Sequence, residues 1–287
     1  MADTLVINEI YLSLQGESTF AGLPCIFVRL TACDLRCSYC DTAYAFTEGQ
    51  KKSVEEVRAE VNRLAEPFRE KPPVTADPAL PNRLTSAPHS ALVTPEPGEG
   101  GLRTCRTEAW RRRAPHSRKL PLVELTGGEP LLQKTSLPLM AGLCDDGFTV
   151  LLETSGAHDI SPVDARVRRI MDLKCPASGE VERNLWGNLH HLKSTDEIKF
   201  VIGTREDYEW TKEKITEHKL DAICPVLLSW VHPLAPEQQH KSLKKVPAGQ
   251  TPISREDLAR QIIADALPVR FQIQLHKVIW PPEKRGV

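Results

Sequence analysis

The chain has 287 residues, of which 40% are hydrophobic and 26% charged, a composition typical of a globular protein with one large α/β domain or two small ones. Its 37 Lys and Arg balance 38 Asp and Glu, so the net charge of −1 offers no general attraction to nucleic acid or to an anionic membrane. No apolar run approaches the roughly 20 residues that span a bilayer, and the start at Met1 shows no secretory signal, so we expect a cytoplasmic protein.

The first patterned region predicts two strands followed by a helix. Residues 4–14 and 24–30 are rich in Val, Ile and Leu, which favour extended structure. Ser53 would cap the helix, because Glu56 three residues later completes a capping box. Apolar residues then recur at helical spacing on one face, at Val54, Val57, Val61 and Leu64.

Residues 66–118 do not show this patterning. Nine of these 53 residues are Pro, no hydrophobic period is sustained, and the end of the segment is rich in Arg. Such a composition cannot bury enough apolar surface to offset the entropy of ordering the chain, and a loop of this length is usually functional or disordered. We therefore expect a mobile, solvated insertion. A contact surface for RNA or for a partner protein is the alternative.

From Lys119 onwards, strands and helices alternate. Strand-like runs occupy residues 122–125, 148–152, 170–173, 197–202, 223–228 and 269–275. Helix starts are indicated where Ser or Thr is followed by Asp, at Ser161 with Asp164, Thr204 with Asp207 and Ser254 with Asp257. This alternation predicts βα units and a parallel sheet. The last run alternates apolar and polar residues, so that strand should have one wetter face.

The strongest chemical signal is a group of three cysteines, Cys33, Cys37 and Cys40, in the spacing C-x3-C-x2-C. Three thiolates on one short loop can ligate three corners of a 4Fe–4S cluster, whereas most such clusters have four cysteine ligands. The fourth iron is then free to bind the amino and carboxylate groups of S-adenosylmethionine, whose reductive cleavage yields a 5′-deoxyadenosyl radical. Zinc, which would favour a second Cys or His pair that does not follow, and a structural or electron-transfer cluster are the alternatives. The other five of the eight cysteines are isolated and are interpreted as small buried residues.

A second motif, Thr-Gly-Gly-Glu-Pro at residues 126–130, follows the predicted strand 122–125. Two glycines at the end of a strand allow the backbone to approach a ligand closely, here the methionyl amino group, and Pro130 would begin the next helix. A Gly-Gly turn alone is more often only a loop. Downstream of the C-x3-C-x2-C spacing, it resembles the radical S-adenosylmethionine superfamily.

Four further segments narrow this resemblance. They are Ser-Leu-Gln-Gly-Glu at 13–17, Phe-Val-Arg-Leu at 27–30, Cys-Asp-Thr at 40–42 and Gln-Ile-Gln-Leu-His-Lys-Val-Ile-Trp-Pro-Pro at 272–282. Together with the Gly-Gly turn, their order resembles the 7-carboxy-7-deazaguanine synthase family over residues 1–65 and 119–287.

Membership of this family would imply a single radical S-adenosylmethionine domain over residues 1–287, folded as an incomplete, open (βα) barrel, with 66–118 as an insertion. The implied reaction converts 6-carboxy-5,6,7,8-tetrahydropterin to 7-carboxy-7-deazaguanine and ammonia, in queuosine and 7-deazapurine biosynthesis. The implied cofactors are a 4Fe–4S cluster, S-adenosylmethionine and Mg²⁺. The implied partners are the pterin substrate, an electron donor such as flavodoxin or ferredoxin, and a second copy of the chain in a homodimer. No nucleic-acid or membrane partner is expected.

The resemblance also implies roles for individual residues. The catalytic set comprises the cluster ligands and a carboxylate that would accept hydrogen bonds from the pterin amino group and ring nitrogens: Cys33, Cys37, Cys40 and Glu153. Contacts with S-adenosylmethionine are implied for Tyr39, Asp41, Gly128, Asp172, Lys174 and Ser229. Contacts with the substrate are implied for Leu14, Gln15, Gly16, Arg29, Thr126, His276 and Pro282. The hydroxyl of Thr42 would bind Mg²⁺.

Each assignment has a structural alternative. Arg29 is expected to pair with the substrate carboxylate, because a planar guanidinium suits a bidentate contact, but an ordinary salt bridge would also explain it. Glu153 and His276 would equally serve as satisfied polar groups at strand ends, and Thr42 as a turn hydroxyl. Their positions near the carboxyl ends of strands favour function, by analogy with barrel-like α/β folds.

Two positions depart from the family pattern. Asp172-Leu173-Lys174 stands where many relatives have Ser-Pro-Lys, and Trp230 stands where a proline is expected. Two other functions also remain open. A radical activase that abstracts hydrogen from a glycine of a partner protein shares the cysteines and the Gly-Gly turn, but needs no Gln-Gly-Glu turn. A metal-binding interaction protein is the alternative from another class.

Overall fold

The computed structural model describes residues 3–69, 120–281 and 284–287. The chain divides into two units, Met1–Pro67 with Leu120–Val287, and Phe68–Lys119. From residue 70 to 119 the second unit lies outside the described residues, so the insertion expected at 66–118 stays a prediction. None of the described helices is long and apolar enough to cross a membrane.

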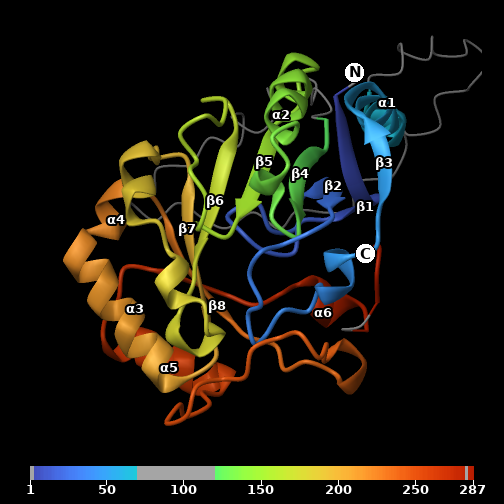
Figure 1. Cartoon of the computed structure of the whole chain (residues 1–287). Helices are drawn as coiled ribbons and strands as arrows, with labels where there is room; N and C mark the ends of the chain where they lie inside the picture. The colour runs from blue at the N-terminus through green and yellow to red at the C-terminus, as the bar shows by residue number, and fades with distance from the viewer. Residues whose placement is uncertain (1–2, 70–119, 282–283) are drawn as a thin grey trace, which may run out of the picture. The chain divides into compact units, whose positions relative to one another are not determined.

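The first unit is built around one mixed sheet of nine strands in the order β3-β1-β2-β4-β5-β6-β7-β8-β9. The strand bounds are β1 (Thr4–Leu14), β2 (Pro24–Leu30), β3 (Gln50–Ser53), β4 (Leu122–Gly127), β5 (Val150–Thr154), β6 (Arg168–Leu173), β7 (Glu197–Ile202), β8 (Val226–Trp230) and β9 (Arg270–Gln272). β1 is antiparallel to β2 and β3, and every neighbouring pair from β2 to β9 is parallel. Because β3 and β9 are opposite edges that do not pair, the sheet stays open (Figure 1), and the predicted open, incomplete (βα) barrel is confirmed.

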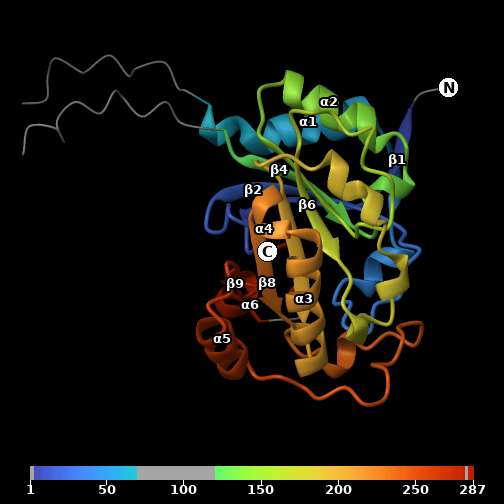
Figure 2. The ribbon, with the colours of Figure 1, turned by 90° about the vertical axis from the view of Figure 1, so that its left-hand side faces the viewer.

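α-Helices follow β4, β7 and β8, whereas β5 is joined to β6 without a helix, and α1 and α2 lie side by side (Figures 1 and 2). The α-helices are α1 (Val54–Ala65), α2 (Ser136–Asp145), α3 (Arg205–His218), α4 (Leu220–Ile223), α5 (Arg255–Ala264) and α6 (His276–Ile279). The short 3-10 helices are η1 (Ala43–Phe46), η2 (Glu66–Phe68), η4 (Pro130–Leu132), η5 (Pro176–Ser178), η6 (Val181–Arg183), η7 (Trp186–His191) and η8 (Pro236–Gln238). Apolar side chains of α1, α2, α3 and α5 join those of the strands in one core.

The pleat of the strands separates two kinds of residue, because successive side chains point to opposite faces of a sheet. One set is apolar and packs into the core shared with the helices, as Val123, Leu125, Leu152, Ile198 and Phe200 do. The alternate set contains polar side chains that line a cavity: Arg29, Glu124, Thr126, Glu153, Asp172, Lys199 and Ser229. The same alternation that builds the core therefore gathers charged groups from successive strands.

Most of the predicted helix starts are correct. The side chain accepts a hydrogen bond from the backbone N–H three residues later at Ser53, Thr204 and Ser254. The start predicted at Ser161 with Asp164 is wrong, because residues 161–164 contain no helix. The Asp164 carboxylate instead accepts hydrogen bonds from the backbone N–H and the guanidinium of Arg166.

Three strand predictions also need correction. The run 269–275 contains only the short β9, because the chain then turns and the Leu275 N–H donates to the Gly16 carbonyl at 2.9 Å. The run 223–228 begins at the last residue of α4, and β8 starts three residues later. β3 was not predicted, because Gln-Lys-Lys-Ser has no apolar alternation. Its extended form comes from antiparallel pairing with β1.

Candidate active site

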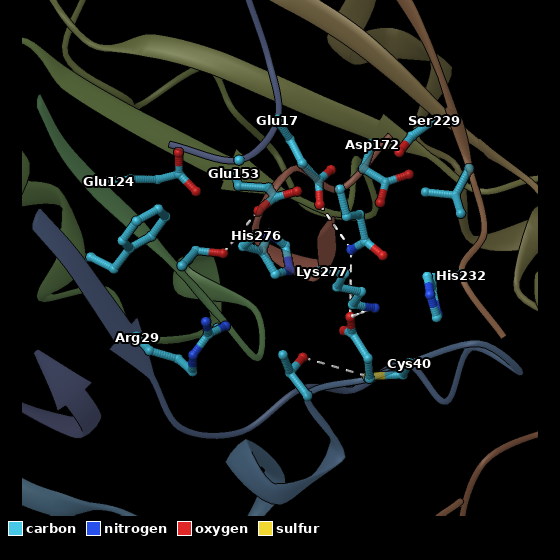
Figure 3. Close-up of a pocket in the computed structure, with 18 of the residues that line it drawn as sticks. Glu17, Arg29, Cys40, Glu124, Glu153, Asp172, Ser229, His232, His276 and Lys277 are labelled. Carbon is cyan, nitrogen blue, oxygen red and sulfur yellow. Dashed lines mark hydrogen bonds and ion pairs between the residues drawn. The ribbon is translucent and has the colours of Figure 1, made fainter. Parts of the chain in front are cut away.

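A cavity is lined by the polar faces of the strands and by the loops that follow them (Figure 3). Its lining includes every residue that the family resemblance assigned except Pro282, which lies outside the described residues. These residues range in the sequence from Leu14 to His276, so only folding brings them together. Their shared position is the central observation for the function of this chain.

The three cysteines lie on the loop between β2 and η1, and their thiols are free. Neighbouring segments hold this loop. The Ser38 N–H donates to the Ser178 carbonyl at 3.0 Å, and the Arg36 N–H donates to the Glu180 carboxylate at 2.7 Å. The Arg36 guanidinium also donates to the Cys33 carbonyl at 2.7 Å. The protein itself therefore supports the loop that carries the thiols.

Burial raises the pKa of Cys33 to about 11 and that of Cys37 to about 12, and the Lys174 ammonium opposes the rise at Cys37. The thiols therefore need a bound cation to ionise, and the thiolate is the form that binds metal. No three His, Cys, Asp or Glu side chains in the described part of the chain surround one ion position. A cubane cluster needs no such convergence, because each thiolate binds a different iron. The donor set fits a 4Fe–4S cluster better than a single zinc ion.

The Gly-Gly turn packs directly against the start of the cysteine loop. Gly127 has a φ of +117°, which only glycine adopts readily, and a Cβ on Gly128 would lie 1.8 Å from the Ala32 carbonyl oxygen. The Glu129 N–H donates to the same carbonyl at 2.8 Å. Both glycines are therefore needed for this close packing. Pro130 begins the 3-10 helix η4 rather than an α-helix.

Three buried polar atoms in the cavity wall lack a hydrogen-bond partner among the described residues: Glu17 Oε2, which has an ion pair with Lys199, the Tyr39 hydroxyl and Asp172 Oδ1. The other carboxylate oxygen of Asp172 accepts from Lys174 Nζ at 2.7 Å. Buried polar groups are normally satisfied, so these atoms mark a place where a polar ligand would bind. Trp230 has a structural role, because its indole N–H donates to the Ile253 carbonyl at 2.9 Å.

Glu153 lies at the centre of an ionic group. Its carboxylate accepts from the Thr126 hydroxyl at 3.0 Å and pairs with Lys199 Nζ at 2.7 Å. Lys199 Nζ also forms an ion pair with Glu17 Oε2, without the angles of a hydrogen bond. Burial alone would raise the pKa of Glu153, but the Lys199 ammonium and the Thr126 hydroxyl lower it to about 2. Glu153 is therefore a charged acceptor that faces the cavity.

The Gln15 side chain is already engaged within the protein. Its amide N–H donates to Glu124, and its amide oxygen accepts from the Glu17 N–H at 2.7 Å. Burial raises the pKa of Glu124 well above its usual range, and the charge on Glu153 adds to this effect. The backbone N–H and carbonyl of Gln15 pair with Leu23 and Gly22, so the second amide N–H of Gln15 is a donor that the turn can still offer to a ligand.

Arg29 has both a structural partner and free capacity. Its Nε donates to Glu9 at 2.8 Å and one terminal nitrogen donates to the Tyr11 hydroxyl at 3.0 Å. The other terminal nitrogen makes no hydrogen bond to any described residue. Both interpretations of Arg29 thus have support, because a salt bridge orients a guanidinium that also lines the cavity (Figure 3).

The C-terminal segment contacts both the cysteine loop and the turn that follows β1. Lys277 pairs with Asp41, which directly follows Cys40. Burial alone would raise the pKa of Asp41, but this ion pair lowers it to about 2. Gln274 donates to Glu17 at 2.9 Å. A Cβ on Gly16 would lie 2.5 Å from a ring nitrogen of His276. This packing explains why no larger residue suits the turn.

Sequence reasoning missed several charged residues of the cavity. Glu124 and Lys199 belong to no motif, and Glu17 and Lys277 were quoted in motifs without a role. A signal was nevertheless present, because Glu124 and Lys199 interrupt apolar strands with a charge. A buried charge is retained only where a partner or a ligand compensates it.

An open βα sheet, a loop with three available cysteines and a Gly-Gly turn packed against that loop define a radical S-adenosylmethionine enzyme. No family model matches the chain. The chain is 38% identical to the 7-carboxy-7-deazaguanine synthase of Koribacter versatilis, over 98% of this chain and 99% of that one. It is 33% identical to the enzyme of that name from Chlorobaculum tepidum, over 99% and 97%. The chain belongs to the 7-carboxy-7-deazaguanine synthase family.

A solved structure agrees in fold. The crystal structure of QueE from Escherichia coli superposes with a TM-score of 0.58 at 20% identity and covers 95% of both chains. At this level of identity, the likeness extends to the fold alone. Membership of the family rests on the two relatives above and implies a 4Fe–4S cluster and S-adenosylmethionine as cofactors.

Proposed function

We propose that this protein converts 6-carboxy-5,6,7,8-tetrahydropterin to 7-carboxy-7-deazaguanine with loss of ammonia. The observation that carries the proposal is the single cavity lined by the cysteine loop, the Gly-Gly turn and the polar strand residues. Cys33, Cys37 and Cys40 would hold the cluster. The cofactors, when bound, supply one-electron cleavage of the sulfonium and abstraction of a hydrogen atom from the substrate.

The residues of the chain bind and orient the substrate. Glu153 would accept hydrogen bonds from the amino group and ring N–H of the pterin, since its carboxylate has acceptor positions beyond those that Thr126 and Lys199 occupy. Arg29 would pair with the carboxylate of the substrate. The unpartnered Tyr39 hydroxyl and Asp172 Oδ1 would contact S-adenosylmethionine. Contacts of this kind would hold the reacting carbon beside the cofactor.

One anaerobic assay tests the proposal. Reconstituted enzyme with a chemical reductant and S-adenosylmethionine should consume the carboxytetrahydropterin and form the deazaguanine and ammonia. Cleavage of S-adenosylmethionine with no loss of pterin would instead favour the radical activase. Zinc, or no metal, in anaerobically purified protein would favour the metal-binding interaction protein.

Arg29→Lys should raise the KM for the pterin about 10- to 100-fold, because an ammonium keeps the charge but cannot form a bidentate contact with a carboxylate. Cleavage of S-adenosylmethionine in the absence of pterin should be unaffected, since that step depends on the cluster. Steady-state kinetics of both reactions provide the measurement. Unchanged pterin kinetics would remove Arg29 from the site.

We further propose that Thr42 binds Mg²⁺ together with the substrate. Thr42 lines the cavity, and its hydroxyl lies 3.7 Å from Cys40 Sγ. Mg²⁺ usually takes few protein ligands and completes its shell with water and substrate oxygens. After chelation, added Mg²⁺ should stimulate the wild type strongly and Thr42→Ala much less. Equal stimulation of both proteins would show that Thr42 is not the ligand.

Two partners complete the proposal. The cluster needs a one-electron donor, for which a flavodoxin or a ferredoxin is the candidate. The protein would also form a homodimer, as the family resemblance implies, and act in the cytoplasm. Sedimentation equilibrium and reduction by each purified donor test the first two statements.

A further inference from the structure

Lys199 is a deeply enclosed cation in the wall of the cavity. It lies on β7, with a side chain that is only 6% exposed, whereas the Glu153 side chain that it contacts keeps 30% of its surface exposed. The ammonium is therefore sealed behind the carboxylate. Of the two side chains, Glu153 therefore offers the larger surface to a ligand in the cavity.

The two carboxylates that Lys199 contacts come from distant parts of the chain. Glu153 lies on β5, and Glu17 lies in the turn after β1 and also accepts from Gln274 at 2.9 Å. Two carboxylates enclosed together repel strongly, because the low dielectric of a protein interior strengthens their interaction. The Lys199 ammonium offsets this repulsion, because it forms an ion pair with both carboxylates. Figure 3 shows Glu17 and Glu153 next to each other in the cavity.

This arrangement leaves Glu153 partly free. Lys199 takes one carboxylate oxygen and Thr126 takes the other, each through a single hydrogen bond. A carboxylate offers about four acceptor positions, so two remain for a ligand. The direction of these positions is set by the two existing hydrogen bonds. An acceptor oriented in this way suits paired N–H donors, as in an aminopyrimidinone ring.

We propose that Lys199 is a positioning residue for substrate recognition. It orients the Glu153 carboxylate toward the ring N–H groups of the substrate and holds the turn that contains Glu17 next to that carboxylate. The inference rests on the proposed function and adds to it the residue, Lys199, that orients the carboxylate proposed to recognise the substrate. The ion pair also connects the turn that would read the pterin with the strand that would bind its opposite edge.

Other charges around Glu153 support this role. Burial would lower the pKa of Lys199, but Glu153 and Glu17 raise it well above its usual range. The charge on Glu153 disfavours a charge on Glu124 of β4, and Lys174 after β6 favours the charge on Glu153. With its pKa lowered, Glu153 stays ionised through the neutral range and loses its charge only as the pH falls toward 2. Removal of Lys199 would take away the largest of the charges that keep Glu153 ionised.

The test compares Lys199→Met, Lys199→Arg and the double variant Lys199→Met with Glu17→Gln. Lys199→Met should raise the KM for the pterin about 10- to 100-fold with a smaller change in kcat, and should add an acid limb to the pH profile of kcat/KM. Glu17→Gln in the same chain should partly restore affinity, because it removes the repulsion. Lys199→Arg keeps the charge and should show a smaller rise in KM.

Lys212→Met is the matched control. Lys212 also pairs with two carboxylates, Glu209 at 3.0 Å and Asp265 at 2.8 Å, but it lies on α3 away from the cavity, so its kinetics should equal those of the wild type. Iron content and pterin-independent cleavage of S-adenosylmethionine should be normal in every variant. If Lys199→Met does not fold, the arginine and double variants carry the test.

Two results would overturn the inference. Wild-type KM and pH profile in Lys199→Met would show that the lysine does not orient the acceptor. An equal loss of pterin affinity in the single and double variants, together with a loss of iron, would show a role in folding only. Absence of pterin turnover in the wild type is distinguishable from both, because it would overturn the proposed function itself and this inference with it.

Discussion

Cys37→Ala is expected to abolish activity and to remove the cluster. Wild-type protein reconstituted without oxygen should contain about four iron and four sulfide per chain, and the variant should lose most of this content and its absorption. The loss should be almost complete, because the loop supplies only three thiolates and an alanine leaves a second iron without a protein ligand. Cys37 is also the most enclosed of the three cysteines, so water cannot easily replace it.

Cys224→Ala is the control for this result. Cys224 is also buried, but it belongs to the hydrophobic core at the start of β8 and does not line the cavity. It should keep its full iron content, with at most a modest loss of stability from the smaller side chain. A redox-active 4Fe–4S cluster retained in Cys37→Ala would contradict the ligand assignment. Loss of iron in both variants would point to general misfolding.

Glu153→Gln should have the second largest effect. The amide keeps the size of the side chain but loses the charge, leaves Lys199 with one fewer anionic partner, and offers an N–H where the pterin also has N–H groups. We expect the KM for the pterin to rise about 10- to 150-fold, equivalent to about 1.5–3 kcal/mol for hydrogen bonds to a charged group.

Cleavage of S-adenosylmethionine without pterin provides the internal control for Glu153→Gln. It should stay close to the wild-type rate, because Glu153 contacts Thr126 and Lys199 and makes no contact with a cluster cysteine. Isothermal titration of the pterin into the anaerobic enzyme would measure the loss of affinity directly. Equal pterin affinity in the variant and the wild type would assign Glu153 to structure alone.

The cysteine motif and the Gly-Gly turn could be recognised in the sequence because the residues of each motif lie close together in the chain. Cys33, Cys37 and Cys40 lie within eight residues, so their spacing alone indicates a shared metal site. The Gly-Gly turn is similarly local, although its packing against Ala32 became visible only in the structure. Helix starts at Ser53 and Thr204 were predictable for the same reason, since a cap depends on residues three positions apart.

Features that depend on distant partners were not predictable. β3 has a polar sequence and is a strand only because β1 lies beside it. The end of the predicted strand 269–275 was lost to a turn, because Leu275 bonds to the distant Gly16. The function of Lys199 depends on Glu17 and Glu153, which are far from it in the chain.

The sequence by itself determined the alternation of strands and helices, the proposed cluster ligands and the family. Each depends on short-range spacing or on the order of motifs, which needs no knowledge of three-dimensional contacts. Only the tertiary structure decided which charges meet, because parallel strands bring residues that are tens of positions apart to the same face of a sheet. Electrostatic interactions in a cavity depend on these distances and on burial, and neither is present in the linear chain.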